Sequence, residues 1–157
     1  MTPKERADLL NRTGRVHAQL NADNLITVYA DYAPAFLKAG AADWVKLFIG
    51  GRFSSVKLEL EALDDDDLKF LGDAMEIQHL NLKGNKRVSG ELLVSLPDQI
   101  GLKTLDIART SISNRDIITL HKFPKLETVY GHKNQFSSDS IAAITFRRPE
   151  LNFRLIY

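Results

Sequence analysis

The sequence contains no cysteine, so neither disulfide bonds nor thiolate metal ligands can stabilise the fold. It also lacks long apolar runs. The longest, such as Leu47–Ile49, fall far short of the roughly 20 residues that a membrane-spanning helix needs. No apolar stretch follows Lys4 and Arg6, as it would in a secretory signal peptide. We therefore expect an intracellular, cytoplasmic protein that does not span a membrane.

Catalytic constellations are missing as well. The Ser and His residues fit no catalytic triad, and the histidines fall in unrelated positions without further zinc ligands. Glycine-rich phosphate-binding loops are absent. The acidic run Asp64–Asp67 lacks the alternating oxygen ligands and the glycine of a calcium-binding loop, and acids are favoured where a helix begins. We expect no enzymatic activity, no cofactor and no bound metal.

Positive and negative charges nearly cancel, at a net +1 over 157 residues, but they are unevenly distributed. The stretch Glu59–Glu76 has eight acids and one base, whereas from Lys83 to the end there are twelve bases and seven acids. Such asymmetry can steer a charged partner, although solvated loops are the simpler explanation. Nucleic-acid binding favours bases clustered on one face with interleaved aromatic residues, but the bases here are expected on both faces and the acidic stretch interrupts them. The one candidate cluster is Arg147, Arg148 and Arg154. We expect no nucleic-acid partner.

What the sequence does contain is an internal repeat of 24 to 25 residues. Four segments follow the pattern LxxLxLxxN, in which x is any residue and the apolar positions hold leucine or a similar side chain. They start at Phe53, Ile77, Leu102 and Leu126. A shortened fifth unit, residues 149–155, closes the series.

Further columns repeat in phase with this pattern. The ninth position of each unit holds, in order, Glu61, Asn85, Thr110 and Asn134. A buried Asn or Thr can satisfy backbone groups where the chain turns after each strand. Each unit then has a candidate helix N-cap, at Asp64, Ser89, Ser113 and Ser137, followed by apolar residues at helical spacing. Every unit thus predicts a short strand followed by a helix.

A single strand–helix unit cannot bury its apolar face alone, so neighbouring units stack and share one core. Alternate strand residues face inward, which places Leu80 and Leu82 in the core and Asn81 outside. At the C-terminal end, Phe153 and Leu155 are expected to seal the core. These properties favour an α/β fold: a curved βα solenoid with a parallel sheet on its concave side and helices on its convex side.

The segment from residue 53 to 157 resembles leucine-rich repeats of the ribonuclease-inhibitor-like kind. The resemblance is carried by residues 77–85 (IQHLNLKGN) and 102–110 (LKTLDIART). Two positions depart from it, because Glu61 replaces the ladder Asn and Gly131 replaces an apolar strand residue. The resemblance implies a right-handed leucine-rich-repeat solenoid over 53–157, built of four repeats and a shortened terminal strand.

Residues 1–52 do not follow the repeat, and we expect them to form an N-terminal helical cap on the solenoid. The segment Thr2-Pro3-Lys4-Glu5 is typical of a helix start with a capping box, and it predicts a helix to about Leu20. A second helix over 31–40, a strand over 44–49 and a tight turn at Gly50-Gly51 are predicted to follow.

The outward-facing strand positions are the candidates for binding, since a sheet face of mixed charge with an aromatic residue suits a polar protein contact. Read across the four repeat strands, the central column is Lys57, Asn81, Asp106 and Tyr130. We predict a partner-binding concave face made of Lys57, Glu59, Asn81, Lys83, Asp106, Tyr130 and His132, beside the outward-facing His79, Thr104 and Thr128. The alternative is a surface that is merely polar.

The leading hypothesis is therefore a non-catalytic module that binds a protein partner of unknown identity through the concave face. The alternative is a subunit, assembly factor or coupling factor of a large complex, docked partly through its N-terminal helices. The layout of the chain is similar to that of the mitochondrial ATP synthase factor B family: N-terminal helices, residues 36–41, four repeats and a short terminal strand. The cysteines of that family are missing here. This resemblance implies a mitochondrial location at the inner membrane. The oligomeric state stays open.

Overall fold

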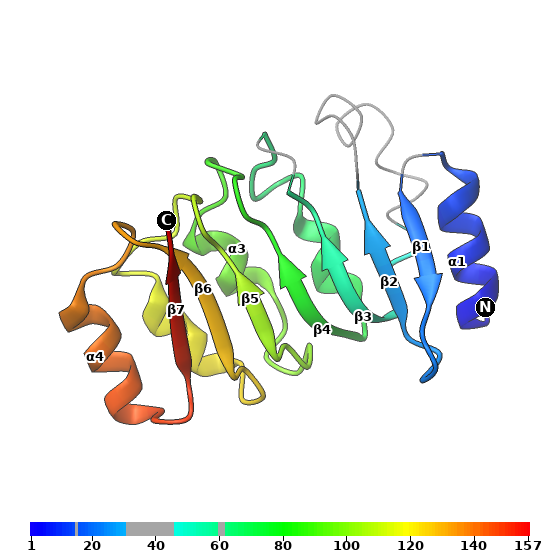
Figure 1. Cartoon of the computed structure of the whole chain (residues 1–157). Coiled ribbons are helices and arrows are strands. Elements are labelled where there is room, and N and C mark those ends of the chain that lie inside the picture. Colours follow the sequence, from blue (N-terminus) through cyan, green and yellow to red (C-terminus); the bar gives the residue numbers. More distant parts are fainter. Residues whose placement is uncertain (15, 31–45, 60–61) are drawn as a thin grey trace.

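The computed structural model describes residues 1–14, 16–30, 46–59 and 62–157, and the statements below concern those residues. Their strands form one sheet in the sequence order β1 to β7 (Figure 1). Strands β1 and β2 pair antiparallel, and every later neighbour pairs parallel. The strands are β1 (His17–Leu20), β2 (Ile26–Tyr29), β3 (Arg52–Lys57), β4 (Glu76–Asn81), β5 (Thr104–Asp106), β6 (Thr128–His132) and β7 (Asn152–Ile156). The predicted mixed α/β fold with a parallel sheet is confirmed.

From β3 onward, one helical segment follows each strand and precedes the next. The helical segments are α1 (Pro3–Arg12), the 3₁₀ helix η1 (Lys69–Asp73), α3 (Gly90–Ser95), the 3₁₀ helix η2 (Ile117–Lys122) and α4 (Ser138–Arg147). Segments η1, α3 and η2 lie on one face of the sheet, behind it in Figure 1. The opposite face carries no helix among the described residues, and we refer to it as the open face.

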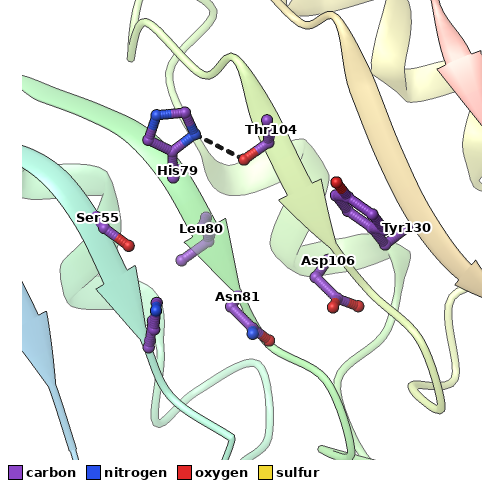
Figure 2. A pocket seen from close by; sticks show the side chains of 8 residues that line it. Ser55, His79, Leu80, Asn81, Thr104, Asp106 and Tyr130 are labelled. Carbon is purple, nitrogen blue, oxygen red and sulfur yellow. Dashed lines mark hydrogen bonds between the residues drawn. The ribbon is translucent and has the colours of Figure 1, made fainter. Parts of the chain in front are cut away.

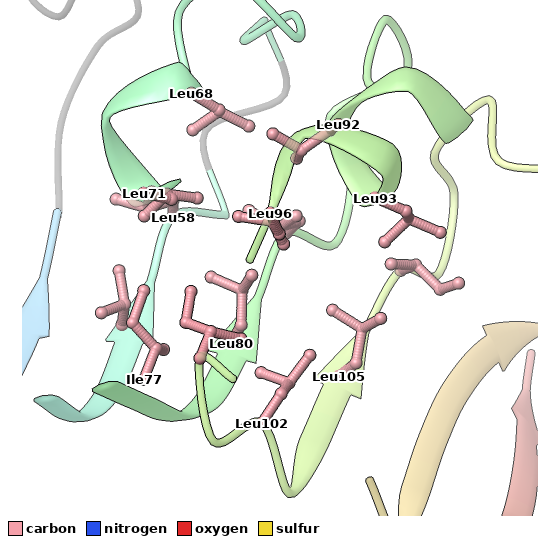
Figure 3. Close-up of a cluster of buried hydrophobic side chains, with 14 of the residues drawn as sticks. Leu58, Leu68, Leu71, Ile77, Leu80, Leu92, Leu93, Leu96, Leu102 and Leu105 are labelled. Carbon is pink, nitrogen blue, oxygen red and sulfur yellow. The ribbon is translucent and has the colours of Figure 1, made fainter. Parts of the chain in front are cut away.

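The core lies between the strands and the helical segments. It is a layer of fully buried leucines and related side chains, several of which are drawn in Figure 3. The strand register matches the repeat columns, because Val56 pairs with Leu80, Leu80 with Leu105, and Leu105 with Val129. The next inward column continues in the same way, since the N–H of Leu58 donates to the carbonyl of Asn81 (2.9 Å) in the following unit. Residues one repeat apart therefore stack on neighbouring strands that run in the same direction.

The side chain of Asn85 joins successive turns of the chain. It is fully buried and donates from Nδ2 to the carbonyls of Leu58 (2.7 Å) and Leu82 (2.8 Å), while its Oδ1 accepts the N–H of Leu63 (3.1 Å). In the next unit, Thr110 donates to the carbonyl of Ile107 (2.8 Å). The ninth position thus satisfies backbone groups in these two units, as the sequence predicts.

The fourth unit uses a different residue for this purpose. Asn134 is exposed, and its neighbour Gln135 donates from Nε2 to the carbonyls of Ile107 and Ile112, both at 2.9 Å. The prediction for Asn134 is therefore wrong by one position, because the longer Gln side chain reaches the preceding turn from the next residue along. Glu61, the predicted exception in the first unit, lies outside the described residues.

Two of the four predicted N-caps are observed in the repeat units. Ser89 accepts the N–H of Glu91 at the start of α3, and Ser137 accepts the N–H of Ser140 at the start of α4. In contrast, Asp64 and Ser113 do not precede a helix directly, since η1 and η2 start several residues after them. Short 3₁₀ turns suffice there because each unit needs only two or three inward apolar side chains to cover its strand.

The N-terminal segment was predicted to be a helical cap, but it also contains strands. The capping box of Thr2 and Glu5 is present, but α1 ends at Arg12, and Gly14 turns the chain with a φ of 66°. Residues His17–Leu20, which were predicted to be helical, form β1 instead. Tertiary pairing with β2 thus overrides the helical pattern, and the prediction of a helix to Leu20 is wrong.

Asn11, near the end of α1, covers the outer edge of β1. Its side-chain amide donates to the carbonyl of Ala18 (2.8 Å) and accepts the N–H of Ala18 (2.7 Å). An edge strand with unpaired backbone groups is a template for unwanted strand addition, and this amide occupies the two groups of Ala18. The first helix therefore stabilises one end of the sheet.

The remaining N-terminal predictions fall partly outside the described residues. The predicted helix 31–40 and Trp44 lie in the undescribed part of the chain. Residues 46–50 form turns rather than the predicted strand, and Gly50 has a φ of 64°, as expected for a tight turn before β3. At the C-terminal end Phe153 packs edge-on against Phe136 (6.2 Å between ring centres), whereas Leu155 is 39% exposed and seals the core only in part.

Candidate functional site on the open face

Four of the predicted contact residues form a row across the open face. The register pairs Lys57 with Asn81, Asn81 with Asp106, and Asp106 with Tyr130. This is the central column that the repeat predicts. Because side chains at paired positions of a sheet point to the same face, the row presents a cation, an amide, a carboxyl group and a phenol side by side. Figure 2 labels the last three, Asn81, Asp106 and Tyr130.

The row extends further than the repeat predicts. Tyr29 on β2 pairs with Lys57, and Arg154 on β7 pairs with Tyr130. The Nζ of Lys57 lies 4.8 Å from the ring centre of Tyr29, a cation–π contact. Tyr29 is not among the predicted contact residues because β2 was not predicted from the sequence. The alternation of apolar and more polar side chains within Ile26–Tyr29 is the signal that could have identified it.

A pocket of about 340 Å³ lies over the middle of this row. It is lined by Ser55, Lys57, His79, Leu80, Asn81, Thr104, Asp106 and Tyr130 (Figure 2). Of the seven predicted contact residues, the pocket brings together Lys57, Asn81, Asp106 and Tyr130. It adds Ser55, His79 and Thr104 from a second row, which pairs Ser55 with His79 and His79 with Thr104.

The other three predicted contact residues lie outside the pocket, towards the carboxyl ends of the strands. Glu59 and Lys83 follow the last residues of β3 and β4, and His132 is the last residue of β6. Glu59 accepts a hydrogen bond from the side-chain amide of Asn81. Nδ1 of His132 accepts the N–H of Asn134 (3.4 Å). These side chains border the pocket row without lining the pocket.

Asn81 and Asp106 are held by the same local geometry one repeat apart. Oδ1 of Asn81 accepts the N–H of Lys83, and Oδ1 of Asp106 accepts the N–H of Ala108, each at 3.0 Å. A short side-chain oxygen that accepts a backbone N–H two residues on is typical of a turn that ends a strand. One oxygen of each side chain is thus fixed by the fold, and Oδ2 of Asp106 has no hydrogen-bond partner among the described residues.

Partial burial changes the titration of two groups in the pocket. Burial raises the pKa of Asp106, against the lowering effect of its hydrogen bond from Ala108 and of the Lys83 charge. Burial also lowers the pKa of His79, and the nearby Lys103 lowers it further. The pocket therefore disfavours isolated charge on both groups.

His79 and Thr104 form a hydrogen bond of 2.7 Å between Nδ1 and Oγ1, drawn as a dashed line in Figure 2. A hydroxyl group beside an imidazole is part of a nucleophile–base pair, but such a pair also needs a third group that orients the ring. Within the described ranges no hydrogen bond is made by Nε2 of His79. This bond fixes two side chains of the pocket floor.

The candidate basic cluster of Arg147, Arg148 and Arg154 is not one surface. Arg148 is only 9% exposed, and its guanidinium donates to the main-chain carbonyls of Leu120, Phe123, Pro124 and Leu126, at 2.8 to 3.4 Å. The sequence alternative of a nucleic-acid contact at these three residues is therefore wrong for Arg148. Its guanidinium stabilises the loop between η2 and β6 through these hydrogen bonds.

Neither a metal-binding cluster nor a membrane-spanning helix occurs in the described part of the chain. No group of three or more His, Asp and Glu side chains there could hold a metal ion. No helix in those ranges has both the length and the apolar character needed to cross a membrane. No protein-family model and no curated protein matches the sequence.

Proposed function

We propose that this chain is a leucine-rich-repeat solenoid whose open face binds a protein partner without catalysing a reaction. The contact surface of this proposal is the row Lys57, Asn81, Asp106 and Tyr130, with Glu59, Lys83 and His132 beside it. The observation that carries the proposal is the open face itself, with its mixed polar row and its pocket.

The uncovered sheet supports both parts of the proposal. Sheets of parallel strands normally have helices on both faces, and their strands are then apolar on both sides. Here the strands are apolar only towards the helical segments, and the other side carries Lys57, Asn81, Asp106 and Tyr130. A parallel sheet with one polar, uncovered face is what stacked strand–helix repeats produce.

The turn-to-turn hydrogen bonds of Asn85 and the repeat period support the leucine-rich-repeat interpretation. Each unit of 24 to 25 residues adds one parallel strand in register with the one before it. The buried amide of Asn85 then connects the carbonyls of two successive turns.

The residue chemistry of the row favours a protein over a small molecule as the ligand. Tyr is enriched at energetic hot spots of protein interfaces, and Tyr130 is half-buried in the row beside Asp106. A partly buried carboxyl group with one unused oxygen, as in Asp106, gains more from a partner's hydrogen-bond donor than a fully solvated one does.

The experiment is affinity capture from the source organism with a paired variant. Asp106→Lys together with Tyr130→Ala should abolish capture of the specific partner, while the circular dichroism spectrum stays that of the parent. The matched control is Glu91→Lys together with Phe146→Ala, a charge reversal and an aromatic truncation at exposed positions of α3 and α4. Equal capture by the parent and the open-face variant contradicts the proposal.

A second candidate function rests on α1. Its outer side carries a hollow of about 370 Å³ lined by Met1, Glu5, Asp8, Leu9 and Arg12. We propose as the alternative that the chain is a subunit or assembly factor of a larger complex and docks there through α1. Membership of the mitochondrial ATP synthase is an expectation from the layout resemblance alone.

Leu9→Asp separates the two candidates, because it changes an exposed side chain of α1 and leaves the open face intact. Loss of complex association in Leu9→Asp, with capture retained by the open-face variant, favours the second candidate. Deletion of residues 1–30 is unsuitable, since it would remove β1 and β2 from the sheet.

A further inference from the structure

Five basic residues occupy the loops at the carboxyl ends of three neighbouring strands. The stretches 82–89, 107–114 and 133–137, which follow β4, β5 and β6, contain no acid. Their bases are Lys83, Lys86, Arg87, Arg109 and Lys133, and we name this set the basic rim. In Figure 1 these loops lie along the upper edge of the sheet.

The three loops contact one another, so the basic rim is continuous. The N–H of Gly84 donates to the carbonyl of Ala108 (2.9 Å), and the hydroxyl of Ser111 donates to the carbonyl of Lys86. On the other side, the N–H of Arg109 donates to Oε1 of Gln135 (3.2 Å). The five cations therefore sit on one fixed backbone strip.

Most of the cations in the basic rim form no ion pair with an acid among the described residues. Within the described residues, Arg87 forms an ion pair with Asp64 (2.9 Å), and no ion pair is seen for Lys86, Arg109 or Lys133. Their side chains are exposed. Two acids close in sequence to these loops are used within the fold, since Asp65 accepts hydrogen bonds from Ser89 and Asp116 accepts them from Ser113.

Arg109 is held in a backbone conformation that suits glycine better. Its φ is 58°, in the left-handed region, and the equivalent residue one repeat earlier is Gly84 with a φ of 84°. A side chain in this conformation costs about 1 kcal/mol relative to glycine. An arginine is nevertheless present here, and its Nη2 reaches the carbonyl of Tyr157 (3.5 Å) beside Lys133, whose Nζ lies 4.6 Å from the Tyr157 ring centre. Arg109 thus adds a cation at the centre of the basic rim in spite of the cost of its left-handed backbone conformation.

We propose that the basic rim docks a short acidic segment, rich in Asp and Glu, of the protein partner. The inference rests on the proposed protein-binding function and deepens it, because it states the charge of the segment that the partner presents next to the open face. Carboxylates along such a segment pair with Lys86, Arg109 and Lys133, and they steer the partner towards the polar row of the open face.

The extent of the basic rim favours a short peptide over a long polyanion. From β4 to β6 the rim covers two strand spacings, about 10 Å. On the β3 side it meets Glu59 and the run Asp64–Asp67, which repel a phosphate backbone that continues across the sheet. Few free cations and an acidic boundary are a poor basis for nucleic-acid affinity at physiological salt.

The test measures binding of a fluorescent poly-glutamate peptide to the full chain by anisotropy at low and moderate salt. The rim variant is Lys86→Glu, Arg109→Glu and Lys133→Glu together. The control is Lys4→Glu, Lys125→Glu and Arg147→Glu, which changes the net charge equally at exposed positions away from the rim. Single-stranded DNA and vesicles with phosphatidylserine are measured in parallel.

We expect the parent to bind the peptide with an affinity that falls as salt rises, the rim variant to lose about tenfold or more, and the control to stay within about twofold of the parent. Arg109→Gly should weaken peptide binding while raising the unfolding midpoint, because it removes the left-handed strain. Equal losses in both triple variants, no peptide binding by the parent, or tighter binding to DNA or vesicles would each overturn the inference. Because this assay needs no native partner, its failure is distinct from a failure of partner capture.

Discussion

In the buried interior, the side-chain amide of Asn85 donates a hydrogen bond of 2.7 Å to the carbonyl of Leu58, one turn of the chain earlier. The same amide satisfies the carbonyl of Leu82 and the N–H of Leu63. Asn85→Ala leaves the buried carbonyl of Leu58 and the N–H of Leu63 without a partner, whereas the carbonyl of Leu82 keeps the backbone N–H of residue 85 (3.3 Å). We expect a loss of about 3 kcal/mol in the free energy of unfolding, measured by urea denaturation.

Asn134→Ala provides the control for this prediction. Asn134 occupies the same column of the repeat but is exposed, so its truncation should change the free energy of unfolding by less than about 0.5 kcal/mol. Gln135→Ala, in contrast, should resemble Asn85→Ala in direction. If Asn134→Ala proves as costly as Asn85→Ala, the assignment of this role to Gln135 is wrong.

Gly131 should not tolerate a larger side chain. A Cβ at this position would lie 2.7 Å from the ring of Phe136, so the ring would have to move. We expect Gly131→Ala to destabilise the fold by about 1 to 3 kcal/mol. In a double-mutant cycle, the cost of Gly131→Ala should shrink in a Phe136→Leu background, and an unchanged cost would show that the ring is not the obstacle.

Arg148 should contribute more to stability than its exposed neighbour Arg147. Truncation of Arg148 to Ala removes the guanidinium donor from the carbonyl of Leu126 in a buried loop, and one of two donors from each of the carbonyls of Leu120 and Phe123. We predict a loss of about 2 to 4 kcal/mol for Arg148→Ala and almost none for Arg147→Ala. Thermal unfolding of both variants checks this, and similar midpoints for the two would contradict the structural role of Arg148.

Asp106 should make the stability of the protein depend on pH. Burial raises the pKa of its carboxyl group in the folded state, so the ionised form is penalised as the pH rises through that value. Asp106→Asn keeps an oxygen for the N–H of Ala108 and removes the penalty. The variant should unfold at a higher temperature than the parent at neutral pH, and this gain should disappear in acid, below the ordinary aspartate pKa.

The exposed Asp23→Asn removes the same charge and is the control for the pH experiment. A gain for Asp106→Asn that persists unchanged into acid would mean that ionisation of Asp106 is not its cause.

The repeat columns predicted the row of the open face because their period fixes the register of the sheet. Val56, Leu80, Leu105 and Val129 all lie in the predicted inward column, and the outward column between them follows by alternation. Binding by this row is a separate matter, since alternation places a side chain on a face without assigning it a role.

The N-terminal strands could not be predicted in the same way. Residues His17–Leu20 begin only five residues after the end of α1 and contain only two apolar side chains, so no clear period distinguishes them from a continuing helix. Their strand conformation depends on pairing with β2 and on the Asn11 amide, both of which are tertiary contacts. The position of Arg148 is likewise hidden, because the carbonyls that it binds lie more than twenty residues away in the chain.

The central claim is that the partner covers the open face of the sheet, and oxidative footprinting of the captured complex tests it most directly. The readout is oxidation of His79 and Tyr130 on the open face, compared with Met75 and Phe146, which are 64% and 88% exposed elsewhere on the molecule. The account predicts that partner binding protects His79 and Tyr130 and leaves Met75 and Phe146 as reactive as in the free chain. Protection of Phe146 or Met75 with unchanged Tyr130 would contradict it.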